Sequence, residues 1–222
     1  MIEVKNLSKT FIYQGEKIKI LDDVSFKVEN KDKIAVIGRN GAGKSTFLNI
    51  IGGVESPDKG EIKRNCSISW PVGKSAGFVP NLTGRQNTTF VLKIFFGNDK
   101  NLIREKLKFI HEFSELGESF DRPFMQYSRG MKSRISFSLS MAFDFDVFLL
   151  DEFMGGGDEN FQKKSTKKLD ELIQNKGIFL VTHNLPEYIK YCNKALLLNR
   201  GKLIEYDIVN EAIKEHKKLL SN

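Results

Sequence analysis

The feature that most constrains this chain is the glycine-rich stretch Gly38-Arg39-Asn40-Gly41-Ala42-Gly43-Lys44-Ser45-Thr46. It fits the pattern Gly-x-x-x-x-Gly-Lys-Ser/Thr, whose backbone N–H groups surround the phosphates of a nucleotide. Glycine lets the backbone converge on an anion, and a helix that starts there directs the positive end of its dipole at the phosphates. In this pattern Lys44 reaches the outer phosphates, and the hydroxyl of Ser45 binds Mg²⁺. The stretch therefore predicts a phosphate-binding loop, called the phosphate loop below.

The segments on both sides of the phosphate loop have the secondary structure that this pattern requires. Lys33–Ile37 is a short apolar run suited to a buried strand, and Thr46–Ile51 is expected to be helical. A chance match in a surface turn would have no reason to lie between a buried strand and a helix. The context therefore favours nucleotide binding over a turn without function.

Two acidic residues and a histidine follow predicted buried strands. Val147–Leu150 leads to Asp151 and Glu152, and Ile178–Thr182 leads to His183. Ligands of open α/β sheets bind at the carboxyl ends of the strands. At that edge Asp151 suits the coordination shell of Mg²⁺, Glu152 is able to orient or deprotonate a water molecule, and His183 suits a γ-phosphate contact. The alternatives are an exposed acidic turn and a structural histidine.

Two further positions are candidates for contact with a nucleotide. Ser128, within residues 127–131 (Tyr-Ser-Arg-Gly-Met), is a natural N-cap, and the helix that it opens presents free backbone N–H groups. Phe11 lies among predicted N-terminal strands, where it is either a core residue or a platform for a flat base. His111 and His216 lack such settings, and we assign them no role.

The bulk composition narrows the class of protein. The hydrophobic fraction of 40% and the charged fraction of 28% are ordinary for a globular protein. No apolar run approaches the ~20 residues that cross a bilayer, and the N-terminus lacks the apolar core of a secretion signal. Cys66 and Cys192 show no metal-site spacing and do not suggest a disulfide framework, so a cytosolic protein is expected. The net charge of +7 is compatible with nucleic acid, an anionic membrane surface or solubility alone.

The order of the predicted elements indicates an α/β fold with a mixed sheet. The first thirty residues are expected to form strands of an antiparallel β layer ahead of the phosphate loop. Apolar residues at three- and four-residue spacing between 85 and 118 indicate a helical insertion, broken at Gly97-Asn98-Asp99. We expect one domain over 1–222, with a nucleotide-binding core of about 1–84 and 144–222 and a helical subdomain of about 85–143.

Together these motifs resemble the ATP-binding subunit of an ABC transporter, and the resemblance covers essentially the whole chain. It implies the P-loop NTPase fold of an ABC cassette, which binds ATP and Mg²⁺ and hydrolyses ATP. The phosphate loop corresponds to Walker A, Val147–Asp151 to Walker B, and Tyr127–Met131 to the signature motif. The resemblance further implies a catalytic glutamate, a switch histidine, an adenine-stacking aromatic residue and a D-loop aspartate, which are Glu152, His183, Phe11 and Asp158 of Gly156-Gly157-Asp158.

A narrower resemblance is to the exporters of capsular polysaccharide. It rests on four segments, Ser69–Gly73, Leu82–Arg85, Tyr127–Met131 and Ser140–Phe143. Residues 184–222 are too few for the extra glycan-binding domain of some O-antigen exporters, which favours the capsule type. The expected function is ATP-driven export of a lipid-linked capsular polysaccharide across the bacterial inner membrane. The alternatives are export of O-antigen or teichoic acid, a nucleic-acid-associated ABC ATPase, and a nucleotide-binding regulator without turnover.

The resemblance also implies partners. Two copies pair head to tail, so that ATP lies between the phosphate loop of one copy and Ser128, Arg129 and Gly130 of the other. A separate integral-membrane permease, with periplasmic and outer-membrane export partners, places the chain at the cytoplasmic face of the inner membrane. Nucleic acid is not expected, because nucleic-acid cassettes carry long coiled coils between the two motifs. No sustained heptad repeat lies between Thr46 and Ser128.

Two residues depart from the family pattern. Val79 stands where most members carry a glutamine that touches Mg²⁺ and the attacking water, and valine does neither. Arg129 replaces a small residue of the signature motif and brings bulk and charge to a phosphate site. It either strengthens the contact with ATP or slows the closure of the pair.

Overall fold

The computed structural model describes residues 1–73, 77–152, 158–182 and 184–221. His183, the predicted switch histidine, and Gly156-Gly157 of the predicted D-loop therefore lie outside the described residues. Contacts between Cα atoms divide the chain into two compact units. Unit 1 consists of Met1–Pro71, Phe145–Phe153 and Ile173–Asn222, and unit 2 consists of Val72–Asp144 and Met154–Leu172.

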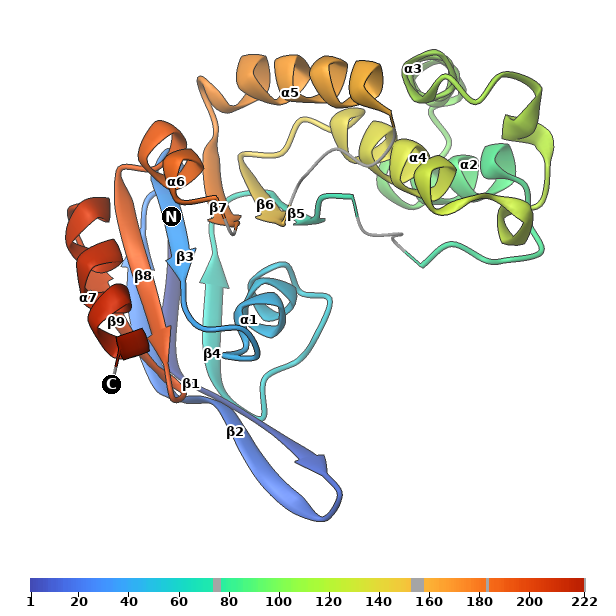
Figure 1. Cartoon of the computed structure of the whole chain (residues 1–222). Coiled ribbons are helices and arrows are strands. Elements are labelled where there is room, and N and C mark those ends of the chain that lie inside the picture. Colours follow the sequence, from blue (N-terminus) through green and yellow to red (C-terminus); the bar gives the residue numbers. More distant parts are fainter. Residues whose placement is uncertain (74–76, 153–157, 183, 222) are drawn as a thin grey trace. The chain divides into compact units, whose positions relative to one another are not determined.

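A six-stranded mixed sheet forms the centre of unit 1 (Figure 1). Five of its strands run parallel, and β9 pairs antiparallel with β8 at one edge. Its four central strands are almost continuously buried, as is typical of parallel strands. The arrangement confirms the predicted α/β fold with a mixed sheet. In order across the sheet the strands are β5 (Ile68–Pro71), β6 (Val147–Asp151), β7 (Gly177–Val181), β3 (Lys33–Ile37), β8 (Lys194–Asn199) and β9 (Lys202–Tyr206).

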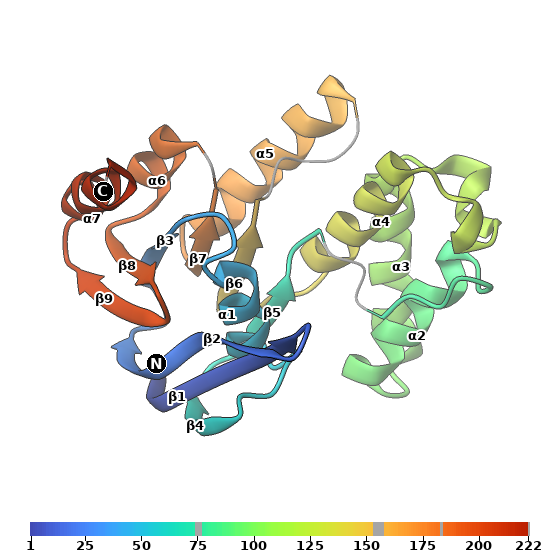
Figure 2. The same ribbon diagram turned by 60° about the horizontal axis from the view of Figure 1, so that its bottom comes forward.

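A second sheet is antiparallel and confirms the predicted N-terminal β layer. It has the order β2-β1-β4, with β1 over Ile2–Tyr13, β2 over Glu16–Val28 and β4 over Lys59–Arg64 (Figure 2). The turn between β1 and β2 uses positive φ angles of 51° at Gln14 and 84° at Gly15, as tight two-residue hairpins require. The sequence predicts a hairpin turn at residues 14–17 between N-terminal strands, and the structure confirms it: β1 and β2 form one long hairpin that turns at Gln14 and Gly15.

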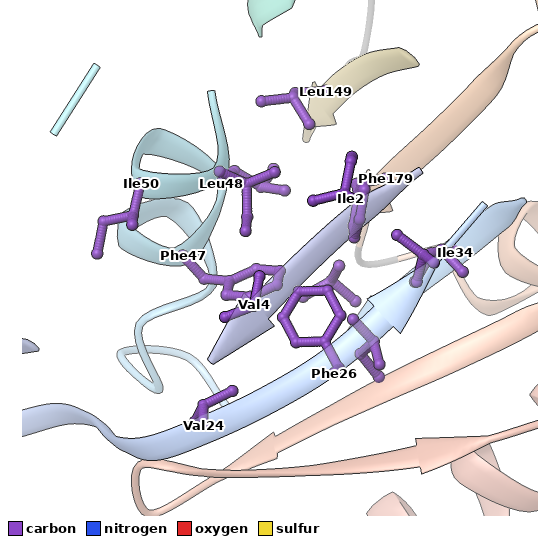
Figure 3. Close-up of a cluster of buried hydrophobic side chains, with 14 of the residues drawn as sticks. Ile2, Val4, Val24, Phe26, Ile34, Phe47, Leu48, Ile50, Leu149 and Phe179 are labelled. Carbon is purple, nitrogen blue, oxygen red and sulfur yellow. The ribbon is translucent and has the colours of Figure 1, made fainter. Parts of the chain in front are cut away.

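The main hydrophobic core of unit 1 lies around helix α1 (Lys44–Ile51), which follows the phosphate loop (Figure 3). The fully buried ring of Phe47 lies 5.6 Å from the Phe26 ring of the antiparallel sheet and 6.1 Å from the Phe179 ring of the mixed sheet. Both sheets therefore contribute to the same core. At the other end of α1, the guanidinium of Arg64 donates to the last carbonyl oxygens of the helix, at 2.8 and 2.9 Å.

Two helices of unit 1 follow the predicted switch position. The first, α6 (Leu185–Tyr191), was not predicted. The second is α7 (Val209–Ser221), where the sequence predicts an amphipathic helix over residues 207–220 with Ile208, Ala212 and Ile213 on its apolar face; it contacts β3, β8 and β9. The helix buries Val209, Ala212 and Ile213, whereas Ile208 precedes it and is exposed, so the predicted face is confirmed only at Ala212 and Ile213.

Unit 2 is helical. Side chains cap two of its helices: Thr83 and Gln86 form a capping box at α2, and the side chain of Asp99 caps α3. The predicted break at 97–99 separates these two helices. Across the part of the chain that the structure describes, no helix is both long and apolar enough to span a bilayer. The helices of unit 2 are α2 (Gly84–Phe96), α3 (Lys100–Ser114), α4 (Arg129–Met141) and α5 (Glu159–Ile173), with short 3-10 turns at Gly117–Asp121 and Phe124–Gln126.

Candidate functional site

The phosphate loop leaves the carboxyl end of β3 and turns into α1. Gly41 and Gly43 have φ angles of 77° and 98°, which residues with a side chain rarely adopt. A Cβ atom on Gly43 would collide with Cγ2 of Ile20, and a Cβ atom on Gly38 would lie 2.6 Å from the carbonyl oxygen of Leu198. The loop therefore needs glycine both for its backbone conformation and for its close packing against β2 and β8.

Lys44 is buried at the start of α1, with only 8% of its surface exposed. Its Nζ donates to the carbonyl oxygens of Gly38 at 2.9 Å and Arg39 at 3.0 Å. Burial lowers the pKa of Lys44 below its ordinary value, and the nearby charges of Glu152 and Asp151 oppose this shift. Because phosphate oxygens are stronger acceptors for a cation than carbonyl oxygens, the loop holds its lysine ready for a phosphate ligand.

Ser45 and Asp151 meet across the sheet edge, although they are far apart in the sequence. The Ser45 hydroxyl, on the first turn of α1, lies 3.2 Å from Oδ1 of Asp151 at the end of β6. A hydroxyl and a carboxylate beside a phosphate site suit Mg²⁺, which binds to few protein oxygens and takes its other ligands from water and substrate phosphates. Within the described ranges no group of three or more His, Cys, Asp or Glu side chains is able to hold a metal by itself.

Glu152 adopts an unusual backbone conformation directly after β6. Its φ is 50°, in the left-handed region, and its N–H donates to the carbonyl oxygen of Val181 at 2.8 Å. This conformation costs a residue with a side chain about 1–3 kcal/mol and is found where the surroundings fix it, commonly at active sites. The turn takes Glu152 out of the strand, and the residue lines the cavity described next.

The first cavity has a volume of about 390 Å³ and lies over the phosphate loop. Phe11 is 39% exposed and is part of its wall. The sequence left two roles open for Phe11, a core residue or a platform for a flat base. Its exposure argues against the core role. The cavity therefore combines an aromatic ring, the phosphate loop and a carboxylate. Its lining residues are Phe11, Ile20, Asn40, Gly41, Gly43, Lys44, Ser45, Thr46 and Glu152.

A second cavity, of about 420 Å³, lies beside the phosphate loop and shares Asn40 and Lys44 with the first. Nothing in the sequence pattern assigned His216 a role, but the structure places it here, together with Arg39. Burial lowers the pKa of His216, and the positive charges of Lys44 and Arg39 lower it further. The available signal was its spacing, three residues after the buried Ile213 on the inner face of α7.

Tyr188 of α6 connects the two strand ends that flank this second cavity. Its buried hydroxyl donates to the carbonyl oxygen of Val36 in β3 and accepts the N–H of Thr182 after β7, both at 3.0 Å. The phosphate loop follows β3, and the predicted switch position follows Thr182. The Tyr188 side chain is thus bonded to the backbone just before the phosphate loop and just before the predicted switch position.

The signature segment (residues 127–131) lies in unit 2, where Ser128 caps α4 as predicted. The Ser128 Oγ accepts the N–H of Met131 at 3.2 Å, and Ser128 and Arg129 are exposed. Burial raises the pKa of the neighbouring Tyr127 to about 12. A Cβ atom on Gly84 would collide with the Tyr127 hydroxyl, so the buried position of Tyr127 requires glycine at residue 84. The exposed helix start leaves backbone N–H groups for an anion.

The predicted site residues that the structure describes are divided between the two units. Phe11, the phosphate loop (residues 38–46), Asp151 and Glu152 belong to unit 1. The remaining described candidates belong to unit 2, where Asp158 caps α5 by accepting the N–H of Phe161 at 3.0 Å. Their contacts with a nucleotide stay predictions. These unit 2 candidates are Ser128, Arg129, Gly130 and Asp158.

Comparisons with known proteins agree with this geometry. Residues 21–155 match the family model described as ABC transporter. The chain is 41% identical over 219 residues to the polysialic acid transport ATP-binding protein KpsT of Escherichia coli, covering 98% of this chain and 99% of the relative. It is 40% identical over 220 residues to the capsule polysaccharide export ATP-binding protein CtrD of Neisseria meningitidis serogroup B, covering 99% of this chain and 100% of the relative.

Solved structures show the same fold. A dimeric ATP-binding cassette in a post-hydrolysis state, bound to ADP and phosphate, has a TM-score of 0.76 at 24% identity, covering 94% of this chain and 99% of that one. An ATP-binding subunit of an ABC transporter has a TM-score of 0.77 at 21% identity and matches over the full length of both chains. With the phosphate loop, the Ser45–Asp151 pair and Glu152 in place, the chain belongs to the ABC transporter family and is one of its ATPase cassettes.

Proposed function

We propose that this chain hydrolyses ATP to power the export of capsular polysaccharide across the bacterial inner membrane. The ATPase part of this proposal rests on the first cavity. The phosphate loop and Glu152 line this cavity, and Ser45 in its wall pairs with Asp151. The polysaccharide part is supported by two relatives of matching length, which are named for polysialic acid transport and capsule polysaccharide export.

ATP binds in the first cavity. The adenine stacks on the exposed ring of Phe11, and the phosphates lie in the phosphate loop at the N-terminus of α1. Lys44 exchanges the carbonyl oxygens of Gly38 and Arg39 for phosphate oxygens. Ser45 and Asp151 would hold Mg²⁺, which would supply neutralisation of the negative charge of the phosphates.

Hydrolysis then requires a water molecule in line with the γ-phosphate. Glu152 orients this water and accepts its proton while the water oxygen bonds to the γ-phosphorus. The bond to the β–γ bridging oxygen breaks, ADP leaves, and Lys44 stabilises the charge on that oxygen. We assign His183 to the γ-phosphate from its place after Thr182 in the sequence.

A second copy completes the site in this proposal. The N–H groups at the start of α4, with Ser128 and Gly130, contact the γ-phosphate held by the phosphate loop of the other copy, and Arg129 adds a positive charge there. The exposure of Ser128 and Arg129 supports this role. ATP binding closes the pair and hydrolysis reopens it, which drives a separate membrane permease and the export partners beyond it. The chain works at the cytoplasmic face of the inner membrane.

The test combines enzymology with glycan analysis. Lys44→Ala should abolish ATP turnover, and Glu152→Gln should bind ATP but lose turnover by orders of magnitude, whereas the exposed control Glu159→Gln should keep both. In cells that depend on this chain, Glu152→Gln should cause polysaccharide to accumulate inside. Turnover by Glu152→Gln within a few-fold of wild type would refute the base assignment. Accumulation of O-antigen or teichoic acid instead of capsule would correct the substrate.

A further inference from the structure

Lys9 lies two residues before Phe11 in β1, and its ammonium group is held from several directions. Its Nζ lies 3.0 Å from Oε1 of Glu55 and 3.5 Å from Oδ1 of Asp58, and it donates to the carbonyl oxygen of Ser56 at 2.9 Å. It also lies over the phenyl ring of Phe11, 5.3 Å from the ring centroid. The Lys9 side chain is only 13% exposed, so these contacts leave it little freedom.

The turn that holds Lys9 is itself bonded to β1 on both sides of the lysine. The Thr10 N–H donates to Oδ2 of Asp58 at 2.7 Å, and the Asp58 N–H donates to the carbonyl oxygen of Ser8 at 2.9 Å. The pairing of β1 with β2 shifts register on both sides of Lys9 and is regular from Thr10 to Tyr13, so Lys9 lies at the irregular point just before the strand segment that carries Phe11. The hydrogen bond with Glu55 raises the pKa of Lys9, which keeps its charge.

Phe11 therefore both contacts a fixed cation and lines a cavity. Phe11 lines the first cavity together with Ile20, whereas Lys9 is not among the described residues of its wall. A cation is attracted to the face of an aromatic ring. An ammonium group that is fixed by two carboxylates therefore restricts how the ring turns about its side-chain bonds.

We propose that Lys9 is a positioning residue for the nucleotide base, because it fixes the orientation of the Phe11 ring on which the base stacks. This inference rests on the proposed stacking role of Phe11. It predicts an effect that depends on the base. Loss of Lys9 weakens the binding of ATP but does not weaken the binding of a phosphate chain that has no base.

The experiment uses the full chain with Mg²⁺ and compares ATP with inorganic tripolyphosphate. Lys9→Met keeps the length of the side chain and removes its charge, and we expect a loss of about three-fold in ATP affinity. The affinity for tripolyphosphate and kcat should stay unchanged, and Lys9→Arg should restore ATP binding. Lys5→Met is the matched control, because Lys5 lies on the same strand and pairs with Glu3 at the surface.

Phe11→Ala separates this inference from the proposed function. We expect Phe11→Ala to weaken ATP binding about ten-fold and Lys9→Met to add no further loss in that background. An unchanged ATP affinity in Phe11→Ala would refute the stacking role itself. If Phe11→Ala weakens ATP binding but Lys9→Met does not, or if Lys9→Met weakens tripolyphosphate equally, the role of Lys9 is refuted. Glu55→Gln, which releases the ammonium without removing it, is the second variant and should show a smaller loss with the same dependence on the base.

Discussion

Arg134 of α4 and Asp158 at the start of α5 form an ion pair in which Nη2 of Arg134 lies 2.6 Å from Oδ2 of Asp158. The Arg134 guanidinium also lies over the ring of Phe161 at 4.8 Å and pairs with Glu115 at 3.4 Å. Lys164 reaches the same Glu115 at 2.7 Å. These alternating charges join α3, α4 and α5 within unit 2. The helix that starts at the signature segment is thereby fixed to the aspartate predicted for the D-loop.

Replacing Arg134 with Met should uncouple these two segments. Because partly exposed ion pairs contribute at most about 1 kcal/mol, we expect the melting temperature to fall by only about 2–4 °C. The kcat for ATP hydrolysis should fall more than ATP affinity, since Asp158 and Ser128 lose their common support. Calorimetry and steady-state kinetics measure both effects, with Arg104→Met on the exposed face of α3 as control. A wild-type kcat in Arg134→Met would limit the ion pair to a structural role.

Alanine at the two glycines of the phosphate loop should have different costs. Gly41 and Gly43 both have positive φ, but a Cβ atom on Gly41 meets no atom of the described residues within 4 Å, whereas one on Gly43 collides with Ile20. Gly41→Ala should lower the free energy of unfolding by about 1–2 kcal/mol from backbone strain alone. Gly43→Ala should lower it further. Urea unfolding without nucleotide measures this, and equal losses in the two variants would contradict the predicted collision.

Asp146 should make the free energy of unfolding of unit 1 depend on pH in the acidic range. Its Oδ2 accepts hydrogen bonds from the N–H and the Oγ of Ser67 at 2.8 and 2.9 Å, and these bonds hold the pKa of Asp146 below its ordinary value of 3.8. A carboxyl with a lowered pKa in the folded state stabilises the fold above its unfolded pKa and loses this effect as the pH falls through the folded value.

Asp146→Asn removes this charge and keeps the shape of the side chain. At neutral pH the variant should be less stable than the wild type by up to about 1 kcal/mol. The difference should shrink as the pH is lowered below about 4, because the wild-type carboxyl then becomes protonated. Urea unfolding over a pH series measures the difference. If it stayed constant over the series, the hydrogen bonds to Ser67 would not depend on the charge.

Asn87 should control the loop that contains Val79. The Asn87 amide is 2% exposed, accepts the N–H of Val79 at 2.7 Å and donates to the carbonyl oxygens of Val79, Leu82 and Thr83 at 3.0 to 3.1 Å. Asn87→Ala leaves these buried groups unpaired and should cost about 2 kcal/mol of stability. If the loop couples the cassette to its permease, polysaccharide export should fall more than ATPase activity. The control is Asn98→Ala at the exposed break after α2.

The elements around the phosphate loop were predictable because their signals are local. The apolar run Lys33–Ile37 is β3, and the run before Asp151 is β6. The sequence assigned Ser45 and Asp151 separately to Mg²⁺, and the structure places the two side chains 3.2 Å apart although 106 positions separate them. In each case continuous burial or a fixed spacing defines the element without knowledge of its neighbours.

Other features depend on tertiary contacts that no local pattern encodes. Helix α6 has seven residues, of which only Tyr188 is buried among those described, so it shows no periodicity. Sequence spacing alone does not indicate that Arg134 pairs with Asp158, because the chain has 35 basic and 28 acidic residues that are possible partners. The exposure of Phe11 depends on the β1–β2 hairpin, whose register shifts on both sides of Lys9, two residues before Phe11.

The Tyr188 hydroxyl links the ends of β3 and β7, because it is hydrogen-bonded to Val36 in β3 and to Thr182 directly after β7. A displacement at the end of β3 therefore cannot leave Thr182 in place without breaking one of these two hydrogen bonds.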